Sequence, residues 1–379
     1  MDLALTPEEE AFRTEARVWL DAHVPAVAPP SLETAEGFAA HRAWEAELAA
    51  DGWSVVDWPA RYGGRGCGLI RWLLFEEEYY AAGAPGRVNQ NGIGLLGPTL
   101  LEHGTPEQRD RVLPPMARGE TVWAQAWSEP EAGSDLAALR SRAVRTAGGW
   151  LLSGQKTWSS RAAFADRAFG LFRSDADAPK PHQGLVYVMF DLRAPGVTVR
   201  PIGRLDGKPA FAELFLDEVF VPDEDVIGAP GQGWRIAMST AANERGLTLR
   251  SPGRFLASAD RLYDLWRALG SPPESAARVA DALVGARAHQ LFTYAAASRF
   301  LAGEPLGPEA SLNKVFWSEY DIALHETALD LLAGDGERAD TEWAERYVFS
   351  LAGPIYAGTN EIQRDIVAER LLGLPKGRR

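Results

Sequence analysis

The chain has 379 residues, 46% of them hydrophobic, a composition typical of a folded protein with room for two or three domains. Lys and Arg number 39 against 52 Asp and Glu, and the net charge of −13 argues against nucleic acid or an anionic membrane as the main partner. The single cysteine, Cys67, excludes an intrachain disulfide framework. No apolar run is long enough to span a bilayer, and Glu8–Glu10 stand where a signal peptide would be apolar. We therefore expect a cytoplasmic protein.

The first third of the chain has helical patterns. Thr6-Pro7-Glu8-Glu9 is a good helix start, with a capping residue, a proline at the first helical position and a carboxylate that completes a capping box. Residues 1–120 are therefore predicted to form an N-terminal α-helical domain, with Glu76–Glu78 on the solvent side of the helix 69–82. The other predicted helices of this domain span 7–20, 41–50, 98–103 and 106–116.

The periodicity then changes to that of strands. Short runs of β-branched, aromatic and alternating residues are separated by Gly, Pro and Asp, which predicts a middle antiparallel β domain over 121–228. The predicted strands are 150–152, 167–172, 185–190, 197–201 and 212–221.

Long helical patterns return in the last third, and residues 229–379 are predicted to form a C-terminal helix bundle. The helix predicted over 308–332 has its apolar face at Leu312, Phe316, Tyr320, Ala323 and Leu331. The whole chain is thus an α+β multidomain protein. It contains no phosphate-binding P-loop and no glycine-rich dinucleotide fingerprint after a strand, so a Rossmann site is not expected.

Two segments carry the chemistry. In the loop Ala126–Asp135, Gly133 lets the backbone approach a ligand, and small polar side chains surround it. In Gly154–Ser160, Trp158 is followed by two hydroxyls. A large flat side chain next to short donors suits a flat heteroaromatic ligand, although each segment alone could be a surface turn or a buried tryptophan.

Together the two segments resemble the flavin-binding signature of the acyl-CoA dehydrogenase family. In that family a Ser-Glu-Pro-x-Ala-Gly-Ser-Asp loop lines the flavin, and a Trp-Ile-Thr/Ser segment covers one ring face. The resemblance extends to Leu-Gly-Leu-Pro at 372–375 and implies FAD as the cofactor. It implies these flavin-contacting residues: Trp127, Ser128, Gly133, Ser134, Trp158 and Ser160, with Ser159 between the last two.

The same resemblance implies a catalytic carboxylate that removes the α-proton of an acyl thioester. Many family members carry it in a Tyr-Glu-Gly-Thr motif, which here reads Tyr-Ala-Gly-Thr, so Ala357 and Gly358 line the substrate pocket without a base. Other members place the base in a Glu-Arg pair on a helix of the C-terminal bundle, and Glu244-Arg245 matches that pair. We expect Glu244 to be the base and Arg245 to shape the pocket, the alternative being a solvated carboxylate and a structural ion pair.

The family also binds the flavin's pyrophosphate and adenine from the neighbouring subunit. Of those motifs Arg299 and Gly334 are retained, whereas Asp330 replaces a glutamine and would repel phosphate. Thr359 and Glu361 start a helix, either as phosphate contacts or as a plain cap. These departures favour an oligomer, either of identical chains or a heterotetramer with a related acyl-CoA dehydrogenase-like chain.

The leading hypothesis is α,β-dehydrogenation of an acyl-CoA to the 2-enoyl-CoA, in fatty acid or steroid catabolism, with a bulky acyl group such as a steroid side chain. Electrons would pass to an electron-transfer flavoprotein or a similar acceptor. Two alternatives stay open: a non-catalytic structural subunit of a heteromeric acyl-CoA dehydrogenase, and a flavin acyl-CoA oxidase. No metal, nucleic acid or membrane is expected to take part.

Overall fold

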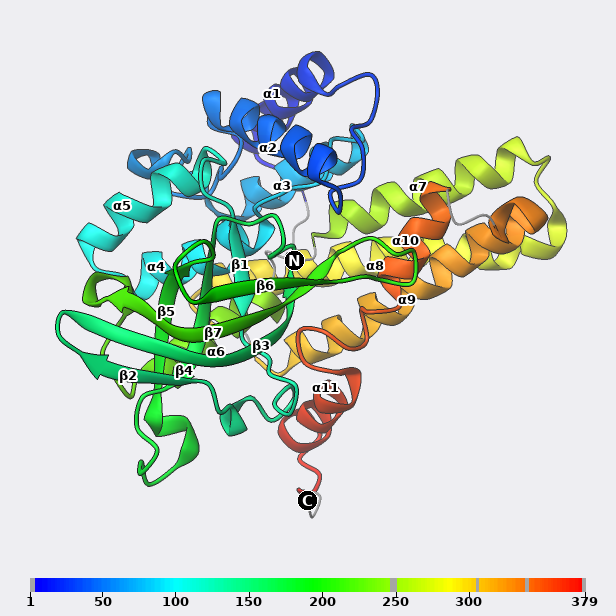
Figure 1. Ribbon diagram of the computed structural model, residues 1–379. Helices are drawn as coiled ribbons and strands as arrows, with labels where there is room; N and C mark the ends of the chain where they lie inside the picture. Colours follow the sequence, from blue (N-terminus) through cyan, green and yellow to red (C-terminus); the bar gives the residue numbers. More distant parts are fainter. Residues whose placement is uncertain (1–3, 246–250, 305–306, 338–340, 377–379) are drawn as a thin grey trace. The chain divides into compact units, whose positions relative to one another are not determined.

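The computed structural model describes residues 4–245, 251–304, 307–337 and 341–376, without the side chains of residues 242–245, 335 and 337. Its elements are traced in Figure 1. They belong to two compact units. The helical unit comprises Met1–Ala26, Cys67–Ala84 and Arg245–Arg379, and the sheet unit comprises Val27–Gly66 and Pro85–Glu244. Residues 1–120 thus contribute to both units, and the predicted boundaries at 120 and 228 stay predictions.

The sheet unit is built on one eight-stranded sheet in the order β6-β7-β3-β2-β4-β5-β8, with β1 paired to β4. The two longest strands, β3 and β7, lie side by side and antiparallel (Figure 1). The strands are β1 Trp123–Ala126, β2 Arg142–Thr146, β3 Gly149–Ser160, β4 Arg167–Arg173, β5 Leu185–Asp191, β6 Val197–Ile202, β7 Phe211–Pro222 and β8 Val226–Ile227.

The sheet is mostly antiparallel, as predicted, but β1 and β2 both pair with β4 in parallel. Neither of these two strands was predicted. In β1, which reads Trp-Ala-Gln-Ala, the two alanines have low strand propensity. In β5 the first six residues are all buried, which explains its continuous apolar run Leu-Val-Tyr-Val-Met-Phe.

Four helices of the sheet unit flank these strands: α2 Ala35–Ala50, α4 Gly97–His103, α5 Pro106–Ala117 and α6 Gly233–Arg245, whose last residue already belongs to the helical unit. A capping box starts α5, where Thr105 Oγ1 accepts from Gln108 N and the Gln108 side chain accepts from Thr105 N. A short π-helix, Gly92–Leu96, leads directly into α4.

The helical unit contains α1 Pro7–His23, α3 Gly68–Ala81, α7 Pro252–Ala268, α8 Ala276–Leu301, α9 Glu309–Leu332, α10 Glu342–Ser350 and α11 Asn360–Ile366. The predicted capping box of Thr6 and Glu9 is present at the start of α1. Helix α7 packs on both α3 and α8, and α9 packs on α8 and α10. Among the described residues, no helix combines the length and the apolar character needed to cross a membrane.

The prediction that Glu76–Glu78 face solvent is wrong, since all three are buried on α3. Because α1, α7 and α8 pack around α3, three consecutive carboxylates cannot all escape burial. Arg13 and Arg17 of α1 bind Glu78 at 2.5 and 2.7 Å, and Gln290 of α8 donates to Glu77. Burial alone would raise the pKa of Glu78, but the two arginines outweigh it and hold this pKa below its ordinary value.

The predicted apolar face of α9 is only partly buried. Leu312 and Phe316 are each 40% exposed, whereas the buried face carries Lys314, Ser318 and Asp321 beside Trp317 and Leu324. These buried polar groups have partners on other helices: Asn360 Oδ1 accepts from both Lys314 and Ser318, and Asp321 pairs with Arg254. Polar pairing within the unit therefore decides which face of α9 turns inward.

Candidate functional site

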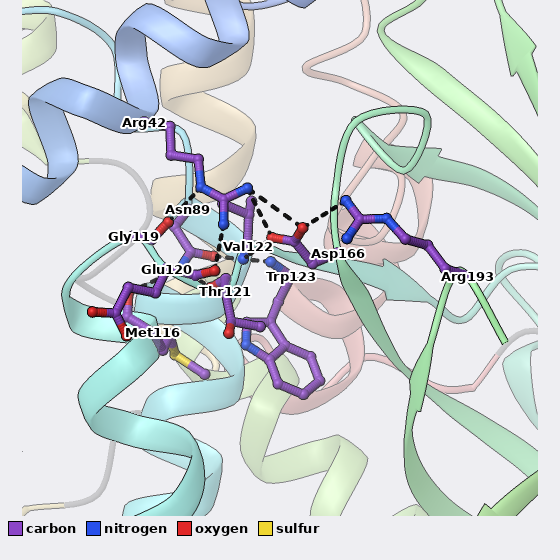
Figure 2. A network of polar contacts seen from close by, with 10 residues as sticks. All are labelled: Arg42, Asn89, Met116, Gly119, Glu120, Thr121, Val122, Trp123, Asp166 and Arg193. Atoms are coloured by element: carbon purple, nitrogen blue, oxygen red, sulfur yellow. Dashed lines mark hydrogen bonds and ion pairs between the residues drawn. The ribbon is translucent and has the colours of Figure 1, made fainter.

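A buried asparagine fixes the start of β1, the strand that leads into the first candidate flavin segment. Asn89 Oδ1 accepts from Trp123 N at 3.0 Å, while Asn89 Nδ2 donates to the carbonyls of Met116 and Thr121 at 3.0 and 2.9 Å (Figure 2). Asn89 is fully buried and all three bonds are to backbone. This side chain therefore helps to set the direction in which β1 enters the sheet.

Asp166 holds the same strand from the other side. Its Oδ2 accepts from Val122 N at 2.9 Å, and its carboxylate lies between the guanidinium groups of Arg42 and Arg193, at 3.1 and 2.8 Å (Figure 2). Arg42 also donates to the carbonyls of Gly119 and Glu120. The residues that precede the loop are thus held by both backbone and charged contacts.

The loop that follows β1 carries four of the residues that the resemblance assigns to flavin, and Trp127, the first of them, is buried. Ser128 is half-buried, and Gly133 and Ser134 are exposed. A Cβ added at Gly133 would meet no atom within 4 Å, and its φ does not lie in the left-handed region. The fold therefore does not require glycine there, and the exposed backbone leaves room for a ligand to approach.

Trp158 lies at an irregularity of β3. The pairing of β3 with β7 shifts register between Lys156 and Ser159, and Trp158 has φ +59°, a left-handed value that costs energy for a non-glycine residue. Its side chain is 60% exposed and contacts Phe211 edge to face, with ring centroids 5.9 Å apart. Strain that presents an aromatic ring to the exterior is typical of a functional position.

The structure brings the two predicted segments together. Thr157 N donates to Ser128 O at 2.9 Å, which joins the β3 irregularity to the loop. Beside this junction, Trp127 Nε1 and Ser159 Oγ are buried and have no hydrogen-bond partner among the described residues. Unpaired buried donors of this kind need a ligand or water. Ser160 is half-buried at the end of the strand.

The sequence reasoning missed an ion pair in these segments. Lys156 and Glu129 are both buried, with Lys156 Nζ 2.8 Å from Glu129 Oε1. A signal was present, because Lys156 occupies an inward-facing position of an alternating strand, where a charge needs a partner. The partner itself lies 27 residues away and could not be read from that pattern.

The candidate base lies on α6. Glu244 and Arg245 are the last two residues of this helix, and their side chains fall outside the described part of the chain. One turn earlier, Thr240 is fully buried, and its Oγ1 lies 2.7 Å from Thr99 Oγ1 and 3.1 Å from Tyr187 Oη. These hydroxyl contacts tie α6 to α4 and β5 and so fix the helix on which residue 244 lies.

Ala357 and Gly358, which are predicted to line the substrate pocket, form a left-handed turn before α11, with φ of +57° and +81°. Gln363 Nε2 donates to both of their carbonyls, at 3.2 and 3.3 Å. Thr359 is the N-cap of α11 and accepts from Ile362 N, so it does act as a helix cap, and Glu361 is exposed in the first turn. A phosphate contact for these last two stays a prediction.

The residues predicted to reach a neighbouring subunit's cofactor lie elsewhere in the helical unit. Arg299 is half-exposed at the end of α8, 4.0 Å from Glu309, and Gly334 is open to a ligand, since a Cβ there would meet nothing within 4 Å. Asp330, expected to repel phosphate, forms an ion pair of 2.5 Å with Arg278. This arginine offsets the negative charge that the sequence pattern places there.

Residues of the sheet unit fit a flat heteroaromatic cofactor. The exposed Trp158 ring supplies a packing face, and the open backbone at Gly133 allows close approach. If FAD binds there, it would supply the acceptor for a hydride.

Comparison with known proteins identifies the family. Models for the N-terminal, middle and C-terminal domains of acyl-CoA dehydrogenases match residues 6–120, 124–219 and 231–372. The chain is 38% identical to acyl-CoA dehydrogenase IpdE1 of Mycolicibacterium smegmatis, over 97% of this chain and 98% of that protein. It is 40% identical to acyl-CoA dehydrogenase FadE34 of Mycobacterium tuberculosis, over 87% of this chain and 46% of that protein.

Solved structures agree over the full length. A structure described as the Tcur3481-Tcur3483 steroid ACAD superposes with a TM-score of 0.87 at 26% identity, covering all of both chains. The ChsE4-ChsE5 complex from Mycobacterium tuberculosis gives the same TM-score at 27% identity, again covering all of both chains. With three domain models matched in order and a relative aligned almost end to end, this chain belongs to the acyl-CoA dehydrogenase family and is an FAD-dependent oxidoreductase that acts on the CH–CH bond of acyl-CoA thioesters.

Proposed function

We propose that this dehydrogenase acts on acyl-CoA esters with a bulky, ring-bearing acyl group such as a steroid side chain. The observation that carries the proposal is the full-length similarity to a structure described as a steroid ACAD. The test is a panel of CoA esters, from butyryl and palmitoyl to steroid side-chain esters, mixed anaerobically with the purified protein. Loss of the oxidised flavin absorbance with the steroid esters alone is expected; equal or faster reduction by the straight-chain esters would contradict it.

Glu244 is proposed as the base. The resembled family uses one of two glutamate positions, and Ala357 cannot accept a proton at the first of them. The carboxylate of Glu244 would remove the α-proton while the β-hydride leaves for the flavin, so that a C–C single bond becomes a double bond and the ester loses two hydrogens. Burial near apolar groups would raise a carboxyl pKa and make it a stronger base.

The variant Glu244→Gln tests this role. Glutamine keeps the size of the side chain but cannot take the proton, so the rate constant of flavin reduction is expected to fall by about 10²–10⁴-fold, the usual contribution of general-base catalysis. The affinities for FAD and for acyl-CoA should change little. The matched control is Glu47→Gln, which removes an exposed carboxylate of α2 that has no proposed role. Reduction at the parent rate in Glu244→Gln would make Glu361, Asp365 and Asp330 the next carboxylates to test.

The cofactor is proposed to bind across two chains. Its ring would contact the sheet-unit residues Trp127, Ser128, Gly133, Ser134, Trp158 and Ser160, while Arg299, Gly334, Thr359 and Glu361 would serve the pyrophosphate and adenine of a neighbouring subunit. The retained arginine and the open backbone at Gly334 support the second set. The pairing of Asp330 with Arg278 removes one objection to it.

The neighbouring subunit is proposed to be a related acyl-CoA dehydrogenase-like chain. Two similar structures are described with paired chain names, Tcur3481-Tcur3483 and ChsE4-ChsE5. Helices α8 and α9 expose neighbouring apolar side chains: Val284 is 68% exposed, and Leu312 and Phe316 are 40% exposed, with Phe316 Cζ 3.7 Å from the position of a Cβ on Gly285. Contiguous apolar exposure of this kind is typical of a subunit interface.

Mass and flavin content test the assembly. Co-expression with the related chain is expected to give a complex of both chains, whereas a stable homotetramer with one FAD per chain and full activity would contradict the mixed assembly.

An electron-transfer flavoprotein is proposed as the electron acceptor, and the cytoplasm is proposed as the location. Oxygen uptake equal to substrate turnover would instead identify an oxidase.

A further inference from the structure

Lys156 is the centre of a buried polar cluster in the sheet unit. Its side chain is fully buried, with Nζ 2.8 Å from Glu129 Oε1 and 2.7 Å from the carbonyl oxygen of Leu171 on β4. The ammonium also lies 4.8 Å from the centre of the Phe172 ring. Burial lowers the pKa of Lys156 to about 8, even though the Glu129 carboxylate opposes the shift.

Glu129 connects the cluster to the loop after β1 and to the residues just before β2. It lies within that loop, and its two carboxylate oxygens accept from the backbone N–H groups of Arg140 and Ser141, at 2.6 and 2.9 Å. The backbones of Glu129 and Ala132 also bond to each other in both directions. One carboxylate therefore joins the flavin loop, the approach to β2 and the β3 strand that carries Lys156.

Stability alone does not explain such a pair. Taking two charges out of water costs several kcal/mol per ion, and replacing a buried ion pair by well-packed neutral groups is often neutral or stabilising. What a buried, fully bonded pair does supply is one defined geometry. Here the pair fixes the position of one candidate flavin segment relative to the other. Glu129 follows Trp127 and Ser128 directly, and Lys156 precedes Trp158 by two residues.

We propose that Lys156 and Glu129 are a positioning pair, which holds the loop 126–135 against the Trp158 irregularity of β3 and thereby sets the affinity for FAD. The inference deepens the proposed cofactor site and depends on it, since these two segments must contact FAD for their relative position to matter. Neither residue needs to touch the cofactor.

The test is the double variant Lys156→Met with Glu129→Gln. Methionine fills the volume of the lysine stem, and glutamine keeps an acceptor for the backbone N–H groups, so both charges leave together and no charge remains unpaired. The affinity for FAD, measured by quenching of flavin fluorescence on the apoprotein, is expected to weaken about 10- to 100-fold, the range known for outer-shell partners of metal sites. The visible circular dichroism of the bound flavin should also change.

A matched control separates positioning from general stability. Arg87 and Glu45 form another buried pair of the same unit, with Arg87 Nε 3.0 Å from Glu45 Oε1. The double variant Arg87→Met with Glu45→Gln also removes both charges of its pair, and it is expected to leave the affinity for FAD unchanged. The Lys156–Glu129 double variant should instead lose affinity for FAD at a comparable melting temperature of the apoprotein.

Each outcome decides the proposal. FAD binding within about twofold of the parent in the folded Lys156–Glu129 double variant would overturn it, as would an equal loss of affinity in the Arg87–Glu45 double variant. If the double variant does not fold, Glu129→Asp keeps the charge but shortens the side chain, and it must weaken FAD binding for the proposal to stand. A parent protein that binds no FAD would instead contradict the cofactor site itself.

Discussion

The Trp158 ring offers the most direct test of the cofactor site. A tryptophan side chain buries about 150–250 Å² when covered, so a residue that is 60% exposed retains roughly 90–150 Å² for a ligand. A flavin that covers one face takes roughly half of this, and at about 25 cal/mol per Å² the contact contributes about 1–2 kcal/mol. Trp158→Ala should therefore weaken FAD binding by about 6- to 25-fold.

A second substitution separates the ring from the backbone. Trp158 has φ +59°, which costs a non-glycine residue about 1–2 kcal/mol. Trp158→Gly loses the same ring but relieves this strain, so its apoprotein should be at least as stable as that of Trp158→Ala, although both bind FAD equally weakly. Equilibrium titration of apoprotein with FAD and thermal melting of the apoproteins measure the two effects.

The control for this comparison is Phe220→Ala. Phe220 is a second exposed aromatic residue of the same sheet, 51% exposed on β7 and paired with Leu151 at the other end of β3. Its removal should leave FAD binding unchanged. An FAD affinity of Trp158→Ala within about twofold of the parent would refute the reasoning, because the exposed ring would then have no ligand.

Three further predictions concern stability and assembly. Burial alone would raise the pKa of Glu78, but two arginines hold it below its ordinary value. The ionised carboxylate therefore stabilises the folded protein at pH values above the pKa that Glu78 has in the unfolded chain. This stabilisation is lost as pH falls through the lower pKa of the folded state. Urea unfolding of the parent should thus lose more free energy than that of Glu78→Gln between about pH 5 and 3, and parallel losses would contradict the assignment. Phe316→Glu should dissociate the assembly in sedimentation experiments, and an unchanged mass would exclude that face of α9 from the interface. Thr240→Val should destabilise the sheet unit by about 1–3 kcal/mol, because Thr99 and Tyr187 lose a buried partner, and Thr240→Ser should restore most of it.

Features that depend on local pattern could be predicted from the sequence. The capping box at Thr6 and the helices of the last third could be predicted from residue types and spacing, and the family, fold class and FAD were implied by the two motifs. The predicted strand 150–152 lies within β3, but β3 is much longer and runs from Gly149 to Ser160. The parallel strand β1 escaped prediction because four residues rich in alanine carry no strand signal and depend on β4 for their place.

Features that depend on long-range pairing could not be predicted. Burial of Glu78 follows from arginines more than sixty residues earlier, and burial of Lys156 follows from Glu129. In α9 the apolar residues suggested the buried face, but Lys314 and Asp321 have partners on other helices and turn inward instead. A sequence pattern shows that a charge lies at an inward position; only the fold shows what neutralises it.

The position of the base can be tested by moving it. Bases at the places of Glu244 and Ala357 serve the same α-carbon in the family that the motifs indicate, so Ala357→Glu in the Glu244→Gln background should recover part of the flavin reduction. The backbone permits the change: Ala357 already has a Cβ at φ +57°, and Gln363 holds its carbonyl at 3.2 Å, so glutamate adds no new backbone strain there.

The half-buried Ala352 provides the control, since a glutamate there adds the same charge to the same segment but not at the position that carries the base in the family. Recovery by Ala357→Glu alone would show that a proton acceptor is what the Glu244→Gln enzyme lacks. No recovery, with FAD and acyl-CoA still bound, would mean that the turn at Ala357 no longer reaches the reacting carbon and that its loss of glutamate reflects a reshaped pocket rather than a relocated base.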